Sequence, residues 1–251
     1  MYNIHHFSFH KCLTSYYSQI MTNFCKNNDL KYSHFNSDKR LYEKTYSDRT
    51  LDVYSLNNNL VTVDKSMRIS QFVRDPRDLI VSGYHYHKWT EESWCRDKTK
   101  RFTHILNDAT YQQYIGSEHN WEEGDSYQDF INKLSPTQGM ILEIIWRKGH
   151  FDTMQGWDLS LENFIRMRYE DIIDNEEEMF FKLYDHYNLP DKWRGNFLTF
   201  VTKFSRKNAT LSQKSHTRNG NYNQWVNEFD ELTYKVFNQF YSVSLKELGY
   251  E

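Results

Sequence analysis

Glycine and proline are scarce in this sequence. The 251 residues contain 9 Gly and 3 Pro, and the first glycine is Gly83. The glycine-rich phosphate loop GxxxxGK[ST] of nucleotide kinases is also absent, which argues against ATP or GTP hydrolysis. Few turn-forming residues interrupt the first third of the chain, so the boundaries of its helices and strands are weakly marked.

Cysteine is equally rare. Cys12, Cys25 and Cys95 lie far apart, make an odd count and form no CxxC pair. This pattern predicts neither a disulfide framework nor a zinc site, and we expect no metal requirement. Thiols that remain unpaired favour a reducing environment, so we expect a cytoplasmic protein.

Long apolar runs are missing as well. No stretch approaches the roughly 20 apolar residues that span a bilayer. The start MYNIHHFSFHK has neither the apolar segment nor the cleavage site of a signal peptide. We therefore expect no membrane partner. A formal net charge of -3 and a pI near 6.4 argue against a general nucleic-acid binder, which usually has a basic surface.

Aromatic residues are abundant instead. They make up 17% of the chain and include 19 Tyr, whereas the hydrophobic share is only 38%. Much of the core must therefore be built from aromatic rings. The length suits an α/β fold with a sizeable core, and we expect one domain covering residues 1–251.

Apolar segments that end in polar residues predict five strands. They cover Ile4–Phe9, Leu30–Phe35, Leu51–Leu56, Arg68–Val73 and Phe164–Arg168. Helical periodicity and capping residues predict helices at Tyr16–Cys25, Asp75–Trp89, Tyr127–Leu134, Thr137–Lys148, Met179–Tyr187, Asp191–Phe204 and Asp230–Leu248. The spacing favours the α/β class, with a central, mainly parallel sheet flanked by helices. Residues 90–126 are expected to form a loop region with short helices, and residues 205–223 a long loop.

The first candidate site is a strand–loop–helix segment that carries His10, Lys11, Cys12, Leu13, Thr14 and Ser15. A helix N-terminus offers unpaired backbone N–H groups and the positive end of its dipole. A lysine and two hydroxyls at that point suit an anion such as phosphate or sulfate. The alternative is that Thr14 or Ser15 only caps the helix while Lys11 is solvated.

The second candidate is Arg74-Asp75-Pro76-Arg77-Asp78, where a strand ends and a helix begins. Ser82 lies four residues after Asp78 on the same helix face. A guanidinium and a hydroxyl that converge there are able to hold a second phosphate. The alternative is a capped helix in which Arg74 pairs with Asp78.

Two further segments complete the set. Tyr169 follows Arg168 at another strand end, and open α/β sheets place their ligands beyond the carboxyl ends of the strands. Arg218, Asn219 and Gly220 lie in the polar loop, where the glycine allows a close backbone approach to a ligand. Tyr169 as a core aromatic and the loop as a solvated turn remain the alternatives.

Together these segments resemble the cytosolic-type sulfotransferases that use 3'-phosphoadenosine 5'-phosphosulfate (PAPS). Lys11-Cys12-Leu13-Thr14 is similar to the family's Lys-x-Gly-Thr loop for the 5'-phosphosulfate, with Lys11 in a catalytic role. Arg74 through Tyr84 matches Arg-Asp-Pro-Arg-Asp, three residues, Ser-Gly-Tyr, which implies 3'-phosphate binding by Arg74 and Ser82. The resemblance also implies that Tyr169 approaches adenine and that Arg218-Asn219-Gly220 clamps the 3'-phosphate.

Three departures from the family pattern stand out. Leu13 replaces a glycine, so the loop must make its turn with a side chain present. Asn219 replaces a lysine and removes one charge. The stretch Tyr54–Asn58 holds no histidine where many members carry their catalytic base. His10 is our first choice for the base. His85, His87, Glu118, His119 and Glu122 are further candidates, as is a site that needs no histidine.

The resemblance implies transfer of a sulfuryl group from PAPS to a hydroxyl or amino group of a small molecule, leaving 3'-phosphoadenosine 5'-phosphate (PAP). A polysaccharide acceptor, a nucleotide kinase that requires Mg²⁺, and a non-catalytic nucleotide-binding or carbohydrate-binding module remain open. A homodimer is a further expectation.

Overall fold

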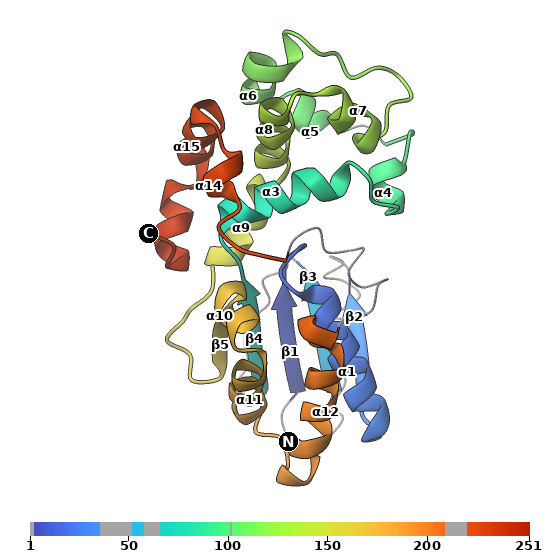
Figure 1. Ribbon diagram of the computed structural model, residues 1–251, viewed down its shortest axis with the longest axis vertical. Helices are drawn as coiled ribbons and strands as arrows, with labels where there is room; N and C mark the ends of the chain where they lie inside the picture. The colour runs from blue at the N-terminus through green and yellow to red at the C-terminus, as the bar shows by residue number, and fades with distance from the viewer. Residues whose placement is uncertain (1–2, 36–51, 58–65, 101, 209–219) are drawn as a thin grey trace. The chain divides into compact units, whose positions relative to one another are not determined.

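The chain divides into two units in the computed structural model shown in Figure 1. The first, which we call the sheet unit, comprises residues 1–74 and 156–217, and the second, the helical unit, comprises residues 75–155 and 218–251. The structure describes residues 3–35, 52–57, 66–100, 102–208 and 220–251. The expectation of a single domain over residues 1–251 stays a prediction.

The sheet unit contains a five-stranded sheet in which every neighbouring pair is parallel. The strand order is β2-β3-β1-β4-β5, so β1 is central. The bounds are β1 Asn3–Ser8, β2 Lys31–Phe35, β3 Asp52–Asn57, β4 Met67–Val73 and β5 Phe164–Arg168. The predicted strands and the α/β class are thus confirmed, with boundaries shifted by a residue or two, as hydrogen bonding at strand ends dictates.

Both faces of the central strand β1 are buried, which explains why this strand shows no alternation of polar and apolar residues. On one face, Phe7 of β1 packs in a cluster with Ile69 of β4 and Trp157. On the other face, His6 of β1 stacks on Tyr17 with ring centroids 3.5 Å apart, and Phe72 of β4 lies edge-on to it. Aromatic rings therefore build much of this core, as the composition predicts.

Helices α1, α11 and α12 pack beside one another in the sheet unit, with α12 in contact with the other two (Figure 1). The helices are α1 Thr14–Asn27, α10 Tyr169–Asp174, α11 Glu176–His186 and α12 Arg194–Phe204, with 3₁₀ turns η2 Asp191–Trp193 and η3 Arg206–Asn208. Tyr16 of α1 ties the three together, because its hydroxyl donates to Glu176 Oε2 at 3.0 Å and lies 3.3 Å from the Val201 carbonyl oxygen.

The described part of the helical unit is built from helices. They are α3 Pro76–His87, α4 Ser93–Arg96, α5 Thr103–Leu106, α6 Ala109–Tyr111, the π-helix η1 Gln112–Gly116, α7 Tyr127–Lys133, α8 Pro136–Trp146, α9 Lys148–Gln155, α14 Trp225–Glu228 and α15 Glu231–Leu248. The short helices between residues 90 and 126 confirm that prediction. The prediction of a single helix at Thr137–Lys148 is wrong at its end. The helix α8 stops at Trp146, and a second helix, α9, begins at Lys148.

Capping residues explain where the longer helices begin. Asp75 caps α3 by accepting the Arg77 backbone N–H at 2.8 Å, and Pro76 supplies the preset first residue. Ser126 and Ser135 form capping boxes at α7 and α8, and Asp230 caps α15. Because these signals are local, the sequence predicts the starts of these four helices to within one residue.

A buried charged cluster joins α3, α7 and α8 inside the helical unit. Glu143 Oε1 lies 2.6 Å from His87 Nδ1 and accepts the Tyr127 hydroxyl at 2.7 Å, while Arg147 Nε lies 3.4 Å from Glu143 Oε2. All four side chains are fully buried. Burial by itself would raise the pKa of Glu143, but His87, Arg147 and Tyr127 together lower it. The carboxylate therefore stays charged inside the unit.

The pH dependence of stability follows from two buried histidines. Burial lowers the pKa of His5 and of His150 to about 3, whereas an unfolded histidine titrates near 6.5. Below about pH 6.5 the unfolded chain therefore binds more protons than the folded chain. The free energy of unfolding consequently decreases as the pH is lowered. We expect a loss of about 1 kcal/mol for each histidine between pH 7.5 and 5.5, measured by urea unfolding. His5→Phe should reduce this loss, and the same change at the exposed His104 should not.

Candidate functional site

The site begins at the point where the sheet reverses its winding order. From β1 the chain passes to β2 and β3 on one side, and from β4 it passes to β5 on the other. β1 and β4 are neighbours, so the carboxyl ends of both strands open at the same edge. Ligands of open α/β sheets bind outside such a switch point. The loop after β1 and Arg74 after β4 are the segments that border it.

The loop between β1 and α1 makes its turn with two non-glycine residues in the left-handed region. Lys11 has a φ of 73° and Leu13 a φ of 61°. Leu13 is the N-cap residue of α1 and offers no side-chain cap to the helix. Because the first helical N–H groups lack partners within a helix, those of residues 14–16 face the loop. The leucine at the family's glycine position is therefore compatible with a helix N-terminus that presents its amides.

A pair of hydroxyls lies under this loop. Ser8 Oγ is 2.8 Å from Thr14 Oγ1, and Thr14 Oγ1 donates to the Phe9 carbonyl oxygen at 3.1 Å. Ser8 is fully buried, and Ser15 is exposed at the start of the helix. The Ser8 contact was not anticipated. Its only sequence signal is its place as the last residue of β1, directly before the loop.

Arg74 is the centre of the contacts at this edge of the sheet. Its guanidinium carbon lies 4.2 Å from the ring centroid of Tyr169, and its Nη1 is 3.5 Å from the Lys11 carbonyl oxygen. Arg74 is 4% exposed and Tyr169 is 5% exposed. The structure thus brings together three of the predicted site residues, from the ends of β1, β4 and β5.

The start of α3 shows how the Arg-Asp-Pro-Arg-Asp segment is used in the helical unit. Asp75 Oδ2 accepts Arg77 Nη2 at 2.8 Å, and the Arg77 guanidinium lies over the Trp225 ring at 4.0 Å. Asp78 Oδ1 accepts the Trp225 backbone N–H at 3.1 Å. Half-buried Ser82 lies one turn further along α3. These contacts anchor α14 on α3, a role that the sequence analysis did not give to Trp225.

The predicted clamp Arg218-Asn219-Gly220 is only partly visible. Arg218 and Asn219 lie outside the described residues. Gly220 has a φ of 63°, a left-handed conformation that favours glycine. The positive φ of Gly220 fits a tight turn at this position. The clamp itself stays a prediction.

The candidate bases fall into different environments. His10 is half-buried in the loop before α1, next to Lys11. His85 Nε2 lies 2.5 Å from Glu228 Oε2, and the His85 side chain is 27% exposed. His87 is fully buried against Glu143, which removes it as a base for an acceptor arriving from solvent. The assignment of His10 stays a prediction.

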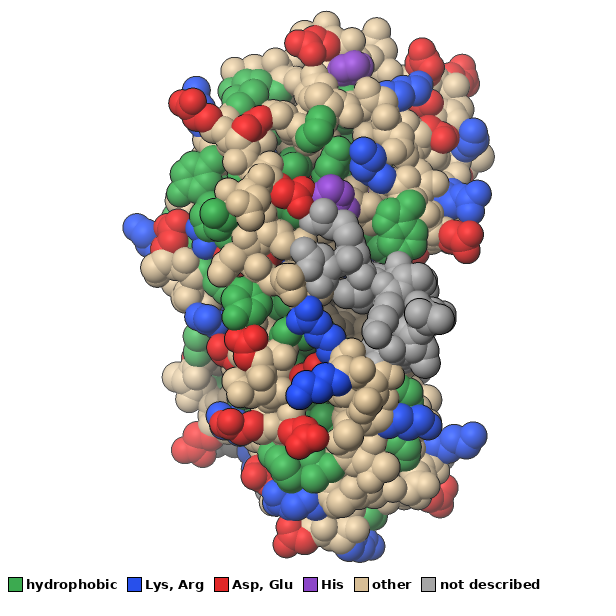
Figure 2. All heavy atoms as spheres, in the orientation of Figure 1, with side chains coloured by type: hydrophobic (Ala, Val, Ile, Leu, Met, Phe, Trp, Pro, Cys, Tyr) green, Lys and Arg blue, Asp and Glu red, His purple; other side chains and the backbone are tan. Residues whose placement is uncertain are grey.

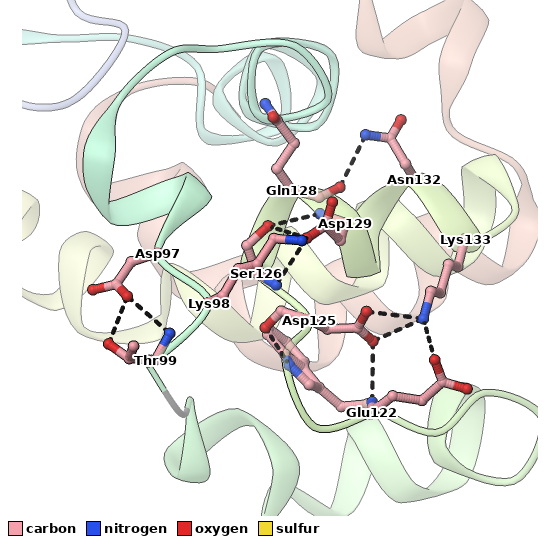
Figure 3. A network of polar contacts seen from close by, with 11 residues as sticks. Asp97, Lys98, Thr99, Glu122, Asp125, Ser126, Gln128, Asp129, Asn132 and Lys133 are labelled. Carbon is pink, nitrogen blue, oxygen red and sulfur yellow. Dashed lines mark hydrogen bonds and ion pairs between the residues drawn. The ribbon is translucent and has the colours of Figure 1, made fainter.

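A surface hollow of about 570 Å³ lies in the helical unit, in the region expected to shape an acceptor pocket. Glu118 and His119 line it, and so does Gln138, whose amide donates to Glu118 Oε2 at 2.8 Å. Lys133 also lines the hollow, but its ammonium is held by Glu122 at 2.8 Å and Asp125 at 2.9 Å (Figure 3). Polar and apolar groups both line the hollow, and its volume is within the range of small-molecule sites.

Known proteins resemble this chain in sequence and in fold. The family described as "Sulfotransferase domain" matches residues 2–249. Among solved structures, the crystal structure of mouse sulfotransferase SULT7A1 complexed with PAP is similar at 13% sequence identity and a TM-score of 0.57. The match covers 98% of this chain and 85% of that chain, and it shows a likeness of fold. Comparison with curated proteins finds no match.

The left-handed conformation of Leu13 makes a prediction about stability. Asparagine tolerates this region and a β-branched residue does not. We expect Leu13→Val to lower the free energy of unfolding by about 1–3 kcal/mol, and Leu13→Asn to lower it less, although valine keeps more apolar surface. Urea unfolding measures both. At the half-buried helical Leu232, the control position, Leu232→Asn should destabilise the protein more than Leu232→Val. If valine is the more destabilising substitution at both positions, the backbone argument is contradicted.

Proposed function

Since this chain belongs to the sulfotransferase domain family, we propose that it transfers a sulfuryl group from PAPS to a hydroxyl or amino group of a small molecule. The observation that carries the proposal is the meeting of Lys11, Arg74 and Tyr169 at the switch point between β1 and β4. A solved structure of similar fold is described as a complex with PAP, which supports the same donor here.

The residues at the switch point fit a nucleotide that carries phosphate groups. The Lys11 side chain and the amides at the start of α1 suit the 5'-phosphosulfate, since both favour negative charge. The Arg74 guanidinium suits the 3'-phosphate, because its planar donors match the geometry of a phosphate. We also propose roles for Ser82 and for Arg218-Asn219-Gly220 at the 3'-phosphate, and for Cys12, Leu13, Thr14 and Ser15 in the loop.

The reaction forms a bond between the acceptor oxygen or nitrogen and sulfur while the bond from sulfur to the 5'-phosphate oxygen breaks. The acceptor loses its proton to a base, for which His10 is our candidate, and PAP leaves. Lys11 and the N-terminus of α1 stabilise the charge that develops on the leaving and equatorial oxygens. The chain's contribution is thus mainly positioning and electrostatic stabilisation.

A small acceptor is favoured over a polysaccharide by the distribution of charge. A long anionic chain is best bound by a continuous basic track. On the face shown in Figure 2, Lys and Arg side chains are interspersed with Asp and Glu.

None of the helices in the described ranges has the length and apolar character needed to cross a bilayer. All three cysteines are buried thiols, which supports our proposal of a cytoplasmic location.

The test of the donor is a thermal-shift titration with PAP, compared with ADP and with ATP in the presence and absence of Mg²⁺. We expect selective stabilisation by PAP without metal. A ligand at about 100 times its dissociation constant adds about 2.7 kcal/mol if it binds only the folded state. Stabilisation by ATP with Mg²⁺ alone would point to a kinase. Binding of PAP without turnover of PAPS in an acceptor screen would point to a non-catalytic module.

Two substitutions separate binding from transfer. Arg74→Ala should weaken PAP binding tenfold or more, because a buried charge-assisted contact is lost, at about 1.4 kcal/mol per tenfold. Lys11→Ala should mainly lower the rate of PAPS turnover, since its charge acts on the leaving oxygens. Calorimetric titration and single-turnover rates measure the two effects, with exposed Lys26→Ala in α1 as the control. Equal loss of binding in both variants is the result that contradicts this division.

A further inference from the structure

The contact between Arg74 and Tyr169 follows from the register of the sheet. β4 pairs with β5 so that Val73 lies opposite Arg168. Arg74 and Tyr169 are therefore the next residues along two neighbouring parallel strands, and both leave the sheet at its carboxyl edge. The Arg74 guanidinium carbon lies 4.2 Å from the Tyr169 ring centroid, and both side chains are buried.

This stacking restricts the guanidinium without using its donors. An aromatic ring under a guanidinium contacts the flat face of the group, whereas the N–H donors point outward in its plane. The Tyr169 ring therefore limits where the Arg74 guanidinium can lie, and Nη1 of Arg74 is 3.5 Å from the Lys11 carbonyl oxygen. An arginine on a flexible stem loses rotamer freedom when it binds an anion, so a guanidinium that is already held in place binds more tightly.

We propose that Tyr169 is a positioning residue that orients Arg74 and thereby gives the nucleotide site its preference for a 3'-phosphate. This inference rests on the proposed function, because it concerns the same nucleotide. It differs from the adenine contact implied by the family resemblance. The ring of Tyr169 acts through Arg74, and its hydroxyl is not needed for that effect.

The test measures the affinities of PAP and of adenosine 5'-phosphate, which lacks the 3'-phosphate, by calorimetric titration. Tyr169→Phe keeps the ring and should keep the ratio of the two affinities within about twofold. Tyr169→Met removes the ring but fills much of its volume, and should lower the ratio about tenfold, the step that corresponds to 1.4 kcal/mol. Arg74→Ala should lower the ratio at least as far. The double variant Arg74→Ala, Tyr169→Met should show no further loss, because both residues act through one contact.

A second measurement covers the case in which Tyr169→Met does not fold. Tyr169→Leu is prepared in parallel, and the Arg74 Nε–H resonance is followed by NMR in every folded variant. Stacking on the ring should shift this resonance upfield in the wild type and in Tyr169→Phe. The shift should vanish in either aliphatic variant, together with the 3'-phosphate preference.

Four results would overturn the inference. Equal weakening of PAP and adenosine 5'-phosphate in the aliphatic variants would assign Tyr169 to adenine alone. Independent losses that multiply in the double variant would show that Tyr169 does not act through Arg74. A wild-type protein without preference for PAP would remove the proposed function as well, whereas a preserved preference with unaffected variants removes only this inference.

Discussion

The parallel pairing of β1 with β4 is the constraint on which the rest of the candidate site depends. Backbone hydrogen bonds between these strands bring residues 8 and 74 to one edge, although 66 positions separate them in the sequence. The pairing of β4 with β5 adds Tyr169 at the same edge. Arg74 and Tyr169 directly follow the last residues of their strands, so neither side chain needs to reach far. A shift in the register of one strand by one residue would turn that strand's side chains to the opposite face of the sheet.

The loop after β1 makes a tight turn without glycine. Lys11 and Leu13 both adopt left-handed conformations, each at a cost of about 1–2 kcal/mol for a residue with a side chain. The loop is stabilised by the Ser8–Thr14 contact and by the bond from the Cys12 N–H to the Phe9 carbonyl. Strain that is retained in this way often marks a functional segment. The same reasoning supports the proposal that this loop binds the donor.

In the helical unit, the helices are positioned by close packing around a buried carboxylate. Helices α3 and α8 approach so closely that a Cβ on Gly83 would lie 2.3 Å from Glu143 Oε2, and one on Gly139 would lie 2.4 Å from the Tyr84 ring. The close approach places the Glu143 carboxylate within reach of His87 and Tyr127. A buried carboxylate is tolerated only with such partners. The position of α3, which carries Ser82, is therefore specified by polar contacts as well as by apolar packing.

The sequence alone determined the strands and most of the longer helices, because periodicity, Asp75 and Pro76 are local signals that need no tertiary partner. It also determined the family resemblance, since the residues around Arg74 and Ser82 are contiguous in the chain. It could not determine the left-handed turn at Leu13, the break at Arg147 or the helix at Trp225. The helix at Trp225 depends on contacts with Arg77 and Asp78, which are far away in the sequence, and no sequence pattern signals the turn at Leu13 or the break at Arg147. The contact between Tyr169 and Arg74 was likewise decided by the tertiary structure, because only the register of two parallel strands brings these side chains together.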